Sequence, residues 1–149
     1  MDPTIDSRND GKETTMCEKP NFYICRHCGN IVTKVKDSGV PVICCGEPMS
    51  LIKANTTDAA QEKHVPVIKQ DGDKVTVTVG STLHPMTEEH HIAWIVLETT
   101  QGSQRKCLKP TGEPTACFSL CKEEKVIAAY EYCNLHGLWM AEMQQKIFI

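Results

Sequence analysis

The stretch "KVTVTVG", residues 74–80, alternates strictly between valine and a polar residue. Successive side chains of a β-strand point to opposite faces, so this pattern predicts a strand with Val75, Val77 and Val79 buried together. Elsewhere the sequence shows no sustained apolar period of 3.6 residues, which would be typical of an amphipathic helix. We therefore expect an all-β fold.

Further strands follow on the C-terminal side of this stretch. "HIAWIVLET" (91–99) has the composition of a strand covered on both faces, and "TACFSL" (115–120) and "KVIAAYEY" (125–132) continue the pattern. Turns rich in Gly and Pro, such as "KPTGEP" (109–114), separate them. Short strands joined by turns predict an immunoglobulin-like β-sandwich for residues 53–149.

Residues 21–52 are expected to form a small, metal-stapled cysteine ribbon. The four cysteines in it have the spacing of metal ligands: Cys25, Cys28, Cys44 and Cys45. Two tight turns can aim four thiolates at one iron or zinc ion, although the adjacent pair requires a twist in the backbone. The alternative is a redox dithiol with two buried cysteines. His27, between the first two cysteines, is expected to be a solvated turn residue.

Composition excludes several classes of function. Residues 1–20 are polar and predict a disordered extension in which Cys17 has no chemical role. A net charge of −3 without a run of basic residues argues against nucleic-acid binding. The longest apolar run, Ile92–Leu97, is too short to cross a membrane, and no secretory signal is recognisable. We expect a cytoplasmic protein whose nine cysteines are partly metal ligands or redox groups.

Five further histidines and one late cysteine occur where strands are expected to end. They are His64, His84, His90, His91, His136 and Cys133. Loops cluster at the two ends of a sandwich, so these side chains are well placed to converge. Periodicity does not choose between the neighbours His90 and His91, because both faces of the following strand are apolar. One of the two should be a ligand and the other should point away.

A set of four imidazoles and one thiolate favours iron. Structural zinc is almost always closed by four ligands, whereas iron with four equatorial imidazoles and an axial thiolate keeps its sixth position open. Two alternatives remain at this stage. Two histidines, Cys133 and Met140 would suit a cupredoxin-like copper electron carrier, and a zinc ribbon joined to a binding module would have no catalytic activity.

Four motifs in series resemble the desulfoferrodoxin family, the two-iron class of superoxide reductases. They are "FYICRHCGN…VICCGEPM", "EKHVPV", "HPMTEEHHIAW" and "EYCNLHGLW", and in this order the resemblance runs across essentially all of residues 20–142. The resemblance implies a catalytic iron bound by His64, His84, His90, His136 and Cys133. It also implies roles for Glu62 and Lys63 in catalysis and leaves His91 as a non-ligand.

The same resemblance implies the reaction and its partners. The expected activity is one-electron reduction of superoxide to hydrogen peroxide, with electrons from a rubredoxin or a similar small donor. The ribbon is expected to hold a second, rubredoxin-like iron, and the protein is expected to be a homodimer. Three surplus cysteines, Cys107, Cys117 and Cys121, depart from the family pattern, and we expect them to serve packing or no function.

Overall fold

The computed structural model describes residues 17–144, and almost every regular element in this range is a strand. The strands are β1 (Phe22–Ile24), β2 (Ile31–Thr33), β3 (Ile43–Cys44), β4 (Glu47–Pro48), β5 (Ser50–Leu51), β6 (Pro66–Asp71), β7 (Lys74–Val79), β8 (Ile92–Thr99), β9 (Gly102–Cys107), β10 (Thr115–Ser119), β11 (Val126–Cys133) and β12 (Gly137–Glu142). The one helix in the described range, α1 (Gln61–His64), is far too short to span a bilayer. The all-β prediction is confirmed, while most of the predicted N-terminal extension lies outside the described residues.

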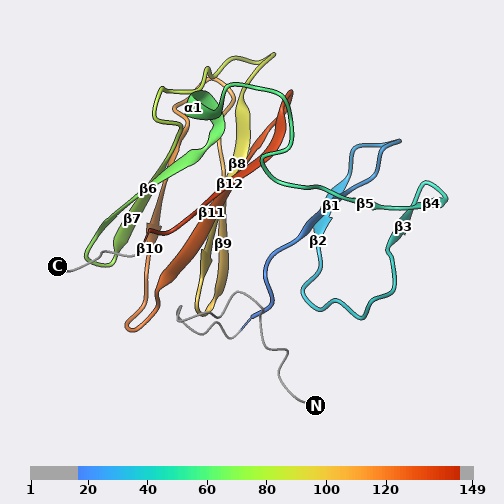
Figure 1. Ribbon diagram of the computed structural model, residues 1–149, viewed down its shortest axis with the longest axis horizontal. Coiled ribbons are helices and arrows are strands. Elements are labelled where there is room, and N and C mark those ends of the chain that lie inside the picture. The colour runs from blue at the N-terminus through green and yellow to red at the C-terminus, as the bar shows by residue number, and fades with distance from the viewer. Residues whose placement is uncertain (1–16, 145–149) are drawn as a thin grey trace.

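Two antiparallel sheets form the predicted sandwich (Figure 1). One has the strand order β10-β7-β6 and the other β12-β11-β8-β9. Val75, Val77 and Val79 are 0% exposed and pack in the core between the sheets, as their alternation predicts. The polar residues between them lie on the outer face of β7, where Thr78 pairs with Thr115 of β10.

The strand β8 is covered on both faces because the ribbon packs against the outer side of its sheet. Ile95 and Leu97 point into the sandwich core, whereas Val96 belongs to a second apolar cluster on the opposite face. The ribbon contributes Phe22 to this second cluster, with its ring centroid 5.0 Å from that of Trp94. This packing explains why "HIAWIVLET" carries apolar residues on both of its faces.

Short strands form the ribbon, which lies beside the sandwich in Figure 1. A three-stranded sheet has the order β2-β1-β5, and β3 and β4 make a separate two-stranded hairpin. The segment after β5 is fixed to the sandwich by the side chain of Asn55, which donates to the carbonyl of Met140 at 3.1 Å and accepts from its N–H at 2.8 Å. The ribbon is thus anchored by an apolar contact and by a hydrogen-bonded linker.

Candidate metal centres

Four cysteine thiols converge in the ribbon, at the turn that follows β1 and at the end of β3. They are Cys25, Cys28, Cys44 and Cys45, and their sulfur atoms all lie within 4.8 Å of one another. The sulfur atoms of Cys28 and Cys44 are 3.6 Å apart. His27 points elsewhere, because its Nε2 lies 3.1 Å from Glu47 Oε2 on the surface. The structure therefore gathers the four predicted ribbon ligands without His27.

The backbone at Cys45 explains how two adjacent cysteines can face one point. Its φ is +52°, in the left-handed region, so the strand alternation that would separate the two side chains is broken there. The backbone N–H of Cys28, more than that of His27, donates to the sulfur of Cys25 and lowers the pKa of that thiol to about 6. Hydrogen bonding with Cys25 and Cys28 raises the pKa of Cys45 to about 12. A bound cation is needed before all four thiols can ionise together.

Four imidazole rings form a closed circle at the α1 end of the sandwich. In order around the circle they are His64, His84, His90 and His136. Neighbouring ring centroids are 4.7, 4.5, 5.2 and 4.9 Å apart, and neighbouring ring planes cross at 77°, 83°, 77° and 86°. Rings placed edge to face in this way can each turn one nitrogen toward a common centre.

The thiol of Cys133 lies on the core side of this circle. Its Sγ is 3.5 Å from His84 Nε2 and 3.9 Å from His136 Nδ1, and the residue is 0% exposed. The ligand atoms of His64, His84, His90 and Cys133 all lie within 4.8 Å of one another. His136 is not part of that tightest group, but its Nδ1 is 3.2 Å from His64 Nε2. The structure thus brings the five predicted ligands to one place.

Loops and strand ends at one end of the sandwich supply these side chains. His64 ends α1, His84 and His90 lie between β7 and β8, Cys133 ends β11, and His136 precedes β12. Close packing of α1 depends on Gly80, since a Cβ there would lie 2.5 Å from the carbonyl oxygen of Glu62. That carbonyl also accepts a hydrogen bond from the N–H of Thr82 at 2.9 Å. The glycine therefore allows the helix that carries His64 to reach the other ligands.

Backbone carbonyls orient two of the rings. His64 Nδ1 lies 2.7 Å from the carbonyl oxygen of Ala60, and His84 Nδ1 lies 2.7 Å from that of Pro85. A carbonyl only accepts, so Nδ1 carries the proton and Nε2 presents its lone pair. Burial lowers the pKa of both histidines, that of His84 to about 4. Both rings are therefore neutral at neutral pH, which is the form that binds metal.

The donor set fits an iron ion. His90 Nε2 is buried and has no hydrogen-bond partner within residues 17–144, and an unpaired buried polar atom costs about 1–3 kcal/mol. A metal at the centre of the circle would satisfy this nitrogen. Burial raises the pKa of the Cys133 thiol, so its proton would be displaced as the cation binds. Five such donors exceed the four of structural zinc and suit iron.

A cavity of about 410 Å³ opens over the circle of imidazoles. Its walls are Ala59, Ala60, Lys63, His64, His84, Pro85, His90 and His136. Cys133 is absent from these walls and packs in the sandwich core, so the thiol and the cavity lie on opposite sides of the rings. Lys63 brings a positive charge to the cavity. The side chain of Glu62 is exposed and does not line it.

Two residues considered as ligands from the sequence point away from this centre. His91 Nδ1 lies 2.9 Å from the carbonyl oxygen of Thr87, which turns its ring away from the other imidazoles. Met140 packs into the apolar cluster on the outer face of its sheet, with Tyr130 and Leu138. The copper alternative depended on Met140, and this position removes its axial ligand.

The surplus cysteines take part in neither centre. Cys17, Cys107, Cys117 and Cys121 are all exposed, and no disulfide joins any of the nine cysteines, all of which lie in the described part of the chain. Cys107, Cys117 and Cys121 were expected to serve packing or no function. The packing alternative is wrong, because β9, β10 and the loop after β10 present these side chains to solvent.

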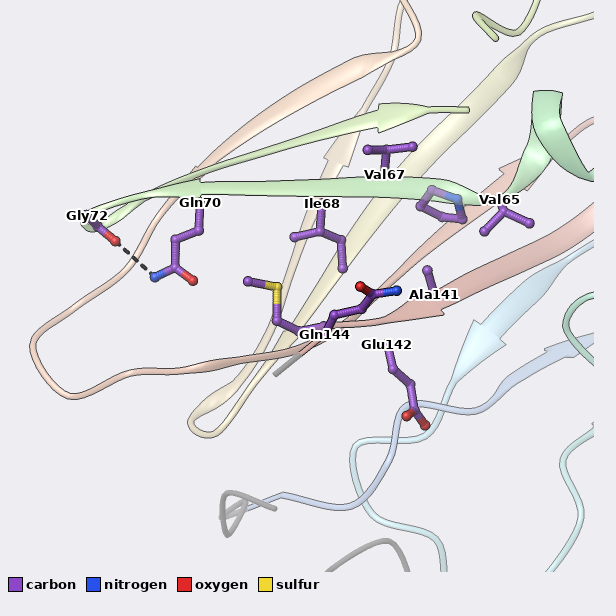
Figure 2. Close-up of a pocket in the computed structure, with 10 residues that line it drawn as sticks. Val65, Val67, Ile68, Gln70, Gly72, Ala141, Glu142 and Gln144 are labelled. Atoms are coloured by element: carbon purple, nitrogen blue, oxygen red, sulfur yellow. Dashed lines mark hydrogen bonds between the residues drawn. The ribbon is translucent and has the colours of Figure 1, made fainter. Parts of the chain in front are cut away.

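A larger hollow of about 830 Å³ lies between β6 and the end of β12 (Figure 2). Its described walls include Val67 and Ile68 on one side and Ala141 on the other, and the Gln70 side chain donates to the carbonyl of Gly72 at its rim. Neither a cysteine nor a histidine is found among those walls. It therefore contributes no ligand to either metal centre.

Trp139 supports the histidine site in a way that the sequence did not reveal. Its indole N–H donates to the carbonyl of His136 at 3.1 Å, and its ring centroid is 5.0 Å from that of His64. The side chain is only 1% exposed. In the sequence it is indistinguishable from an ordinary core aromatic residue, so no local signal could have assigned it this role.

Comparison with known proteins gives one consistent result. Residues 56–142 match the desulfoferrodoxin family and residues 17–52 match the desulfoferrodoxin N-terminal domain. The chain is 52% identical over 121 residues to the desulfoferrodoxin of Nitratidesulfovibrio vulgaris, covering 81% of this chain and 94% of that protein. It is 47% identical over 127 residues to that of Syntrophotalea carbinolica, covering 85% and 99%.

A solved structure has the same architecture as most of this chain. The crystal structure of the superoxide reductase from Treponema pallidum superposes with a TM-score of 0.72 at 39% identity, covering 84% of this chain and all of that one (100%). The cysteine ribbon, the sandwich and the sequence matches all lead to one assignment. This protein is a member of the desulfoferrodoxin family.

Proposed function

We propose that this protein is a superoxide reductase, which converts superoxide to hydrogen peroxide by adding one electron and two protons. The observation that carries this proposal is the circle of four imidazoles with a buried thiol on one side and an open cavity on the other. A small oxygen species can enter such a cavity while the protein holds every other side of the metal. The T. pallidum relative, which is named a superoxide reductase, supports the same reaction.

Two iron ions complete the protein, one in each cluster of ligands. We assign the catalytic iron to His64, His84, His90, His136 and Cys133, and the ribbon iron to Cys25, Cys28, Cys44 and Cys45. Bound at the histidine site, iron would supply the electron that superoxide accepts, and the Cys133 thiolate would donate electron density to the ion. The carbonyls of Ala60 and Pro85 orient the rings of His64 and His84. Burial lowers the pKa of both rings and so keeps them neutral.

Lys63 attracts the substrate and supplies protons through water. Superoxide is an anion, and the net charge of −3 gives the whole protein no attraction for it. Among the described residues, Lys63 is the one ionisable side chain lining the cavity that is not a proposed ligand. Its positive charge at the mouth of a cavity raises the local concentration of an anion. Its ammonium group can also hold the water from which the product takes its protons.

We assign Glu62 the role of closing the site when substrate is absent. It precedes Lys63 in α1 and its side chain is exposed, so a rotamer change could bring the carboxylate over the cavity. A carboxylate is an oxygen ligand suited to oxidised iron. The test is the absorption spectrum of the oxidised protein: the Glu62→Ala variant should differ from the wild type, and an unchanged spectrum would remove this role.

The electron donor is a rubredoxin or a similar small carrier. Reduction consumes one electron per superoxide, and the protein must regain it from outside. Two ribbon ligands, Cys28 and Cys45, are exposed, which gives a carrier access to that centre. Electron transfer from reduced rubredoxin, followed by absorbance in a stopped-flow instrument, tests the assignment.

The remaining proposals concern organisation. We assign the ribbon to residues 21–52 and the catalytic sandwich to residues 53–149, which is supported by family matches that meet near residue 52. A homodimer is supported by the exposed apolar side chains of the ribbon, such as Val40 and Ile43. Free thiols support a reducing, cytoplasmic location. Sedimentation equilibrium and cell fractionation test the last two.

Pulse radiolysis with metal analysis tests the central proposal. The expected result is iron in both sites and loss of superoxide that requires a reductant and yields hydrogen peroxide without molecular oxygen. Evolution of oxygen would indicate a dismutase instead. Copper or zinc in the histidine site, with no reaction, would overturn the proposal.

A further inference from the structure

We propose that Asn134 is a positioning residue that fixes His90 at the metal site by tying the loop before β8 to the turn after β11. The inference rests on the proposed iron site, but it concerns a residue outside the ligand set. Asn134 directly follows Cys133 and lies two residues before His136. Its side chain is therefore carried by the same turn that carries two of the ligands.

The side-chain amide of Asn134 forms hydrogen bonds with the backbone on both sides of His90. Its Nδ2 donates to the carbonyl of Glu89 at 2.9 Å, and its Oδ1 accepts from the N–H of His91 at 2.9 Å. The backbone N–H of Asn134 also donates to the carbonyl of His91, at 3.2 Å. Three hydrogen bonds thus connect residues that are 43 to 45 positions apart in the chain.

His90 needs such support more than His64 and His84 do. The rings of His64 and His84 are oriented by hydrogen bonds from their own Nδ1 to carbonyl oxygens. For His90, Nε2 is buried without a partner in the described part of the chain. The direction of its ring therefore depends on where its backbone is held.

Hydrogen bonds between Thr87 and His90 make the loop before β8 rigid enough for one further contact to position it. The N–H of Thr87 donates to the carbonyl of His90 at 2.9 Å, and Thr87 Oγ1 accepts from the N–H of His90 at 3.0 Å. These bonds close the loop on itself and do not connect it to the other ligands. Asn134 supplies that connection, so a shift of its side chain would move His90 relative to Cys133 and His136.

Asn55 provides a matched control within the same chain. Its side-chain amide also donates to one backbone carbonyl and accepts from one backbone N–H, both of Met140. That pair links the segment after β5 to β12 and contacts none of the proposed ligands. Both Asn→Ala substitutions remove two side-chain hydrogen bonds, so they should cost similar folding stability.

The test compares iron release to a ferrous chelator from full-length, iron-loaded variants, read together with the thiolate-to-iron absorption. Asn134→Ala should release iron from the histidine site at least about tenfold faster than the wild type, as is typical when a partner of a ligand is removed. Release from the ribbon should be unchanged. Asn55→Ala should leave both rates unchanged, and Asn134→Asp, which keeps only the acceptor for His91, should lie in between.

A double-mutant cycle identifies the ligand through which Asn134 acts. If it acts through His90, adding Asn134→Ala to His90→Ala should not accelerate iron release further, while adding it to His64→Ala should. Equal effects on both backgrounds, or an unchanged rate in Asn134→Ala alone, would overturn the inference. A wild-type protein that holds no iron in the histidine site would instead overturn the proposed function.

Discussion

His64 Nε2 lies 3.2 Å from His136 Nδ1, although 72 residues separate them in the chain. The two rings cross at 86°, and the ring of Trp139 packs beside His64. This approach requires α1 to press against the end of β7, where Gly80 leaves room for the Glu62 carbonyl. The geometry of the histidine site therefore depends on a residue that carries no side chain.

Gly80→Ala should disrupt the histidine site. The added Cβ would lie 2.5 Å from the oxygen of Glu62 and 2.9 Å from the carbonyl carbon of Lys63, and because both are backbone atoms, α1 must move. We expect iron affinity at the histidine site to fall on the order of tenfold or more, with the ribbon iron retained. Iron analysis after dialysis measures this. Gly112→Ala, with a nearest contact of 3.3 Å, is the control; equal losses in both variants would contradict the prediction.

Lys63→Ala should slow the reaction with superoxide by about tenfold at low salt and flatten its dependence on ionic strength. The physical reason is loss of the positive charge that lines the cavity. Pulse radiolysis over a range of salt concentrations measures both effects. Lys69→Ala makes the same change in net charge on β6, outside the cavity, and should leave the rate nearly unchanged. If the two variants behave alike, the effect is one of net charge and Lys63 does not steer the substrate.

The alternation of "KVTVTVG" was sufficient to predict the buried face of β7, because a strand with one face in the core must alternate. The polar strand β9 could not be predicted in the same way. It lies at the edge of its sheet, pairs only with β8, and most of its side chains are exposed, so no apolar pattern marks it. Its hydrogen-bonded pairing with the apolar strand β8 makes it a strand, and the preferences of its own residues do not.

The ligands of the two metal centres could be predicted from the sequence to different extents. Cysteine spacing predicted the ribbon ligands, because each of two turns can direct a pair of cysteines that are close in the sequence toward one metal ion. In the histidine site, loop positions predicted convergence, but the choice of His90 over His91 came from family resemblance. In the structure, His91 points away from the site because the carbonyl of Thr87 accepts a hydrogen bond from its ring and the side chain of Asn134 accepts one from its backbone N–H. Such contacts between distant segments leave no periodic signal.

Cys45→Ser should remove the ribbon iron and leave the histidine site loaded. A serine hydroxyl is a poor replacement for a thiolate, and the four-cysteine cluster shares no residue with the other centre. Iron analysis and visible absorption should show loss of one site only, with the rate of superoxide reduction by pre-reduced protein retained. Cys117→Ser, an exposed cysteine on β10, should change neither. Collapse of that rate in Cys45→Ser would make the ribbon iron obligatory.

Glu131 is a carboxylic acid in the sandwich core. It is 0% exposed, and neither of its carboxyl oxygens has a hydrogen-bond partner among the described residues. It lies on β11 between Ala129 and Cys133, both of which belong to the apolar core. Burial raises its pKa from 4.5 to about 9, so the folded protein holds it in the neutral form at neutral pH.

Glu131→Gln should therefore make folding stability less dependent on pH. Between pH 4.5 and about 9 the folded protein keeps a proton that the unfolded chain releases, so the free energy of unfolding should fall as pH rises. One proton contributes a slope of at most about 1.4 kcal/mol per pH unit. Metal binding adds its own pH dependence to both proteins, and the difference between their slopes isolates Glu131. Denaturant unfolding from pH 5 to 9 measures it, with the exposed Glu113→Gln as control; parallel slopes in wild type and Glu131→Gln would show that the carboxyl is ionised in the fold.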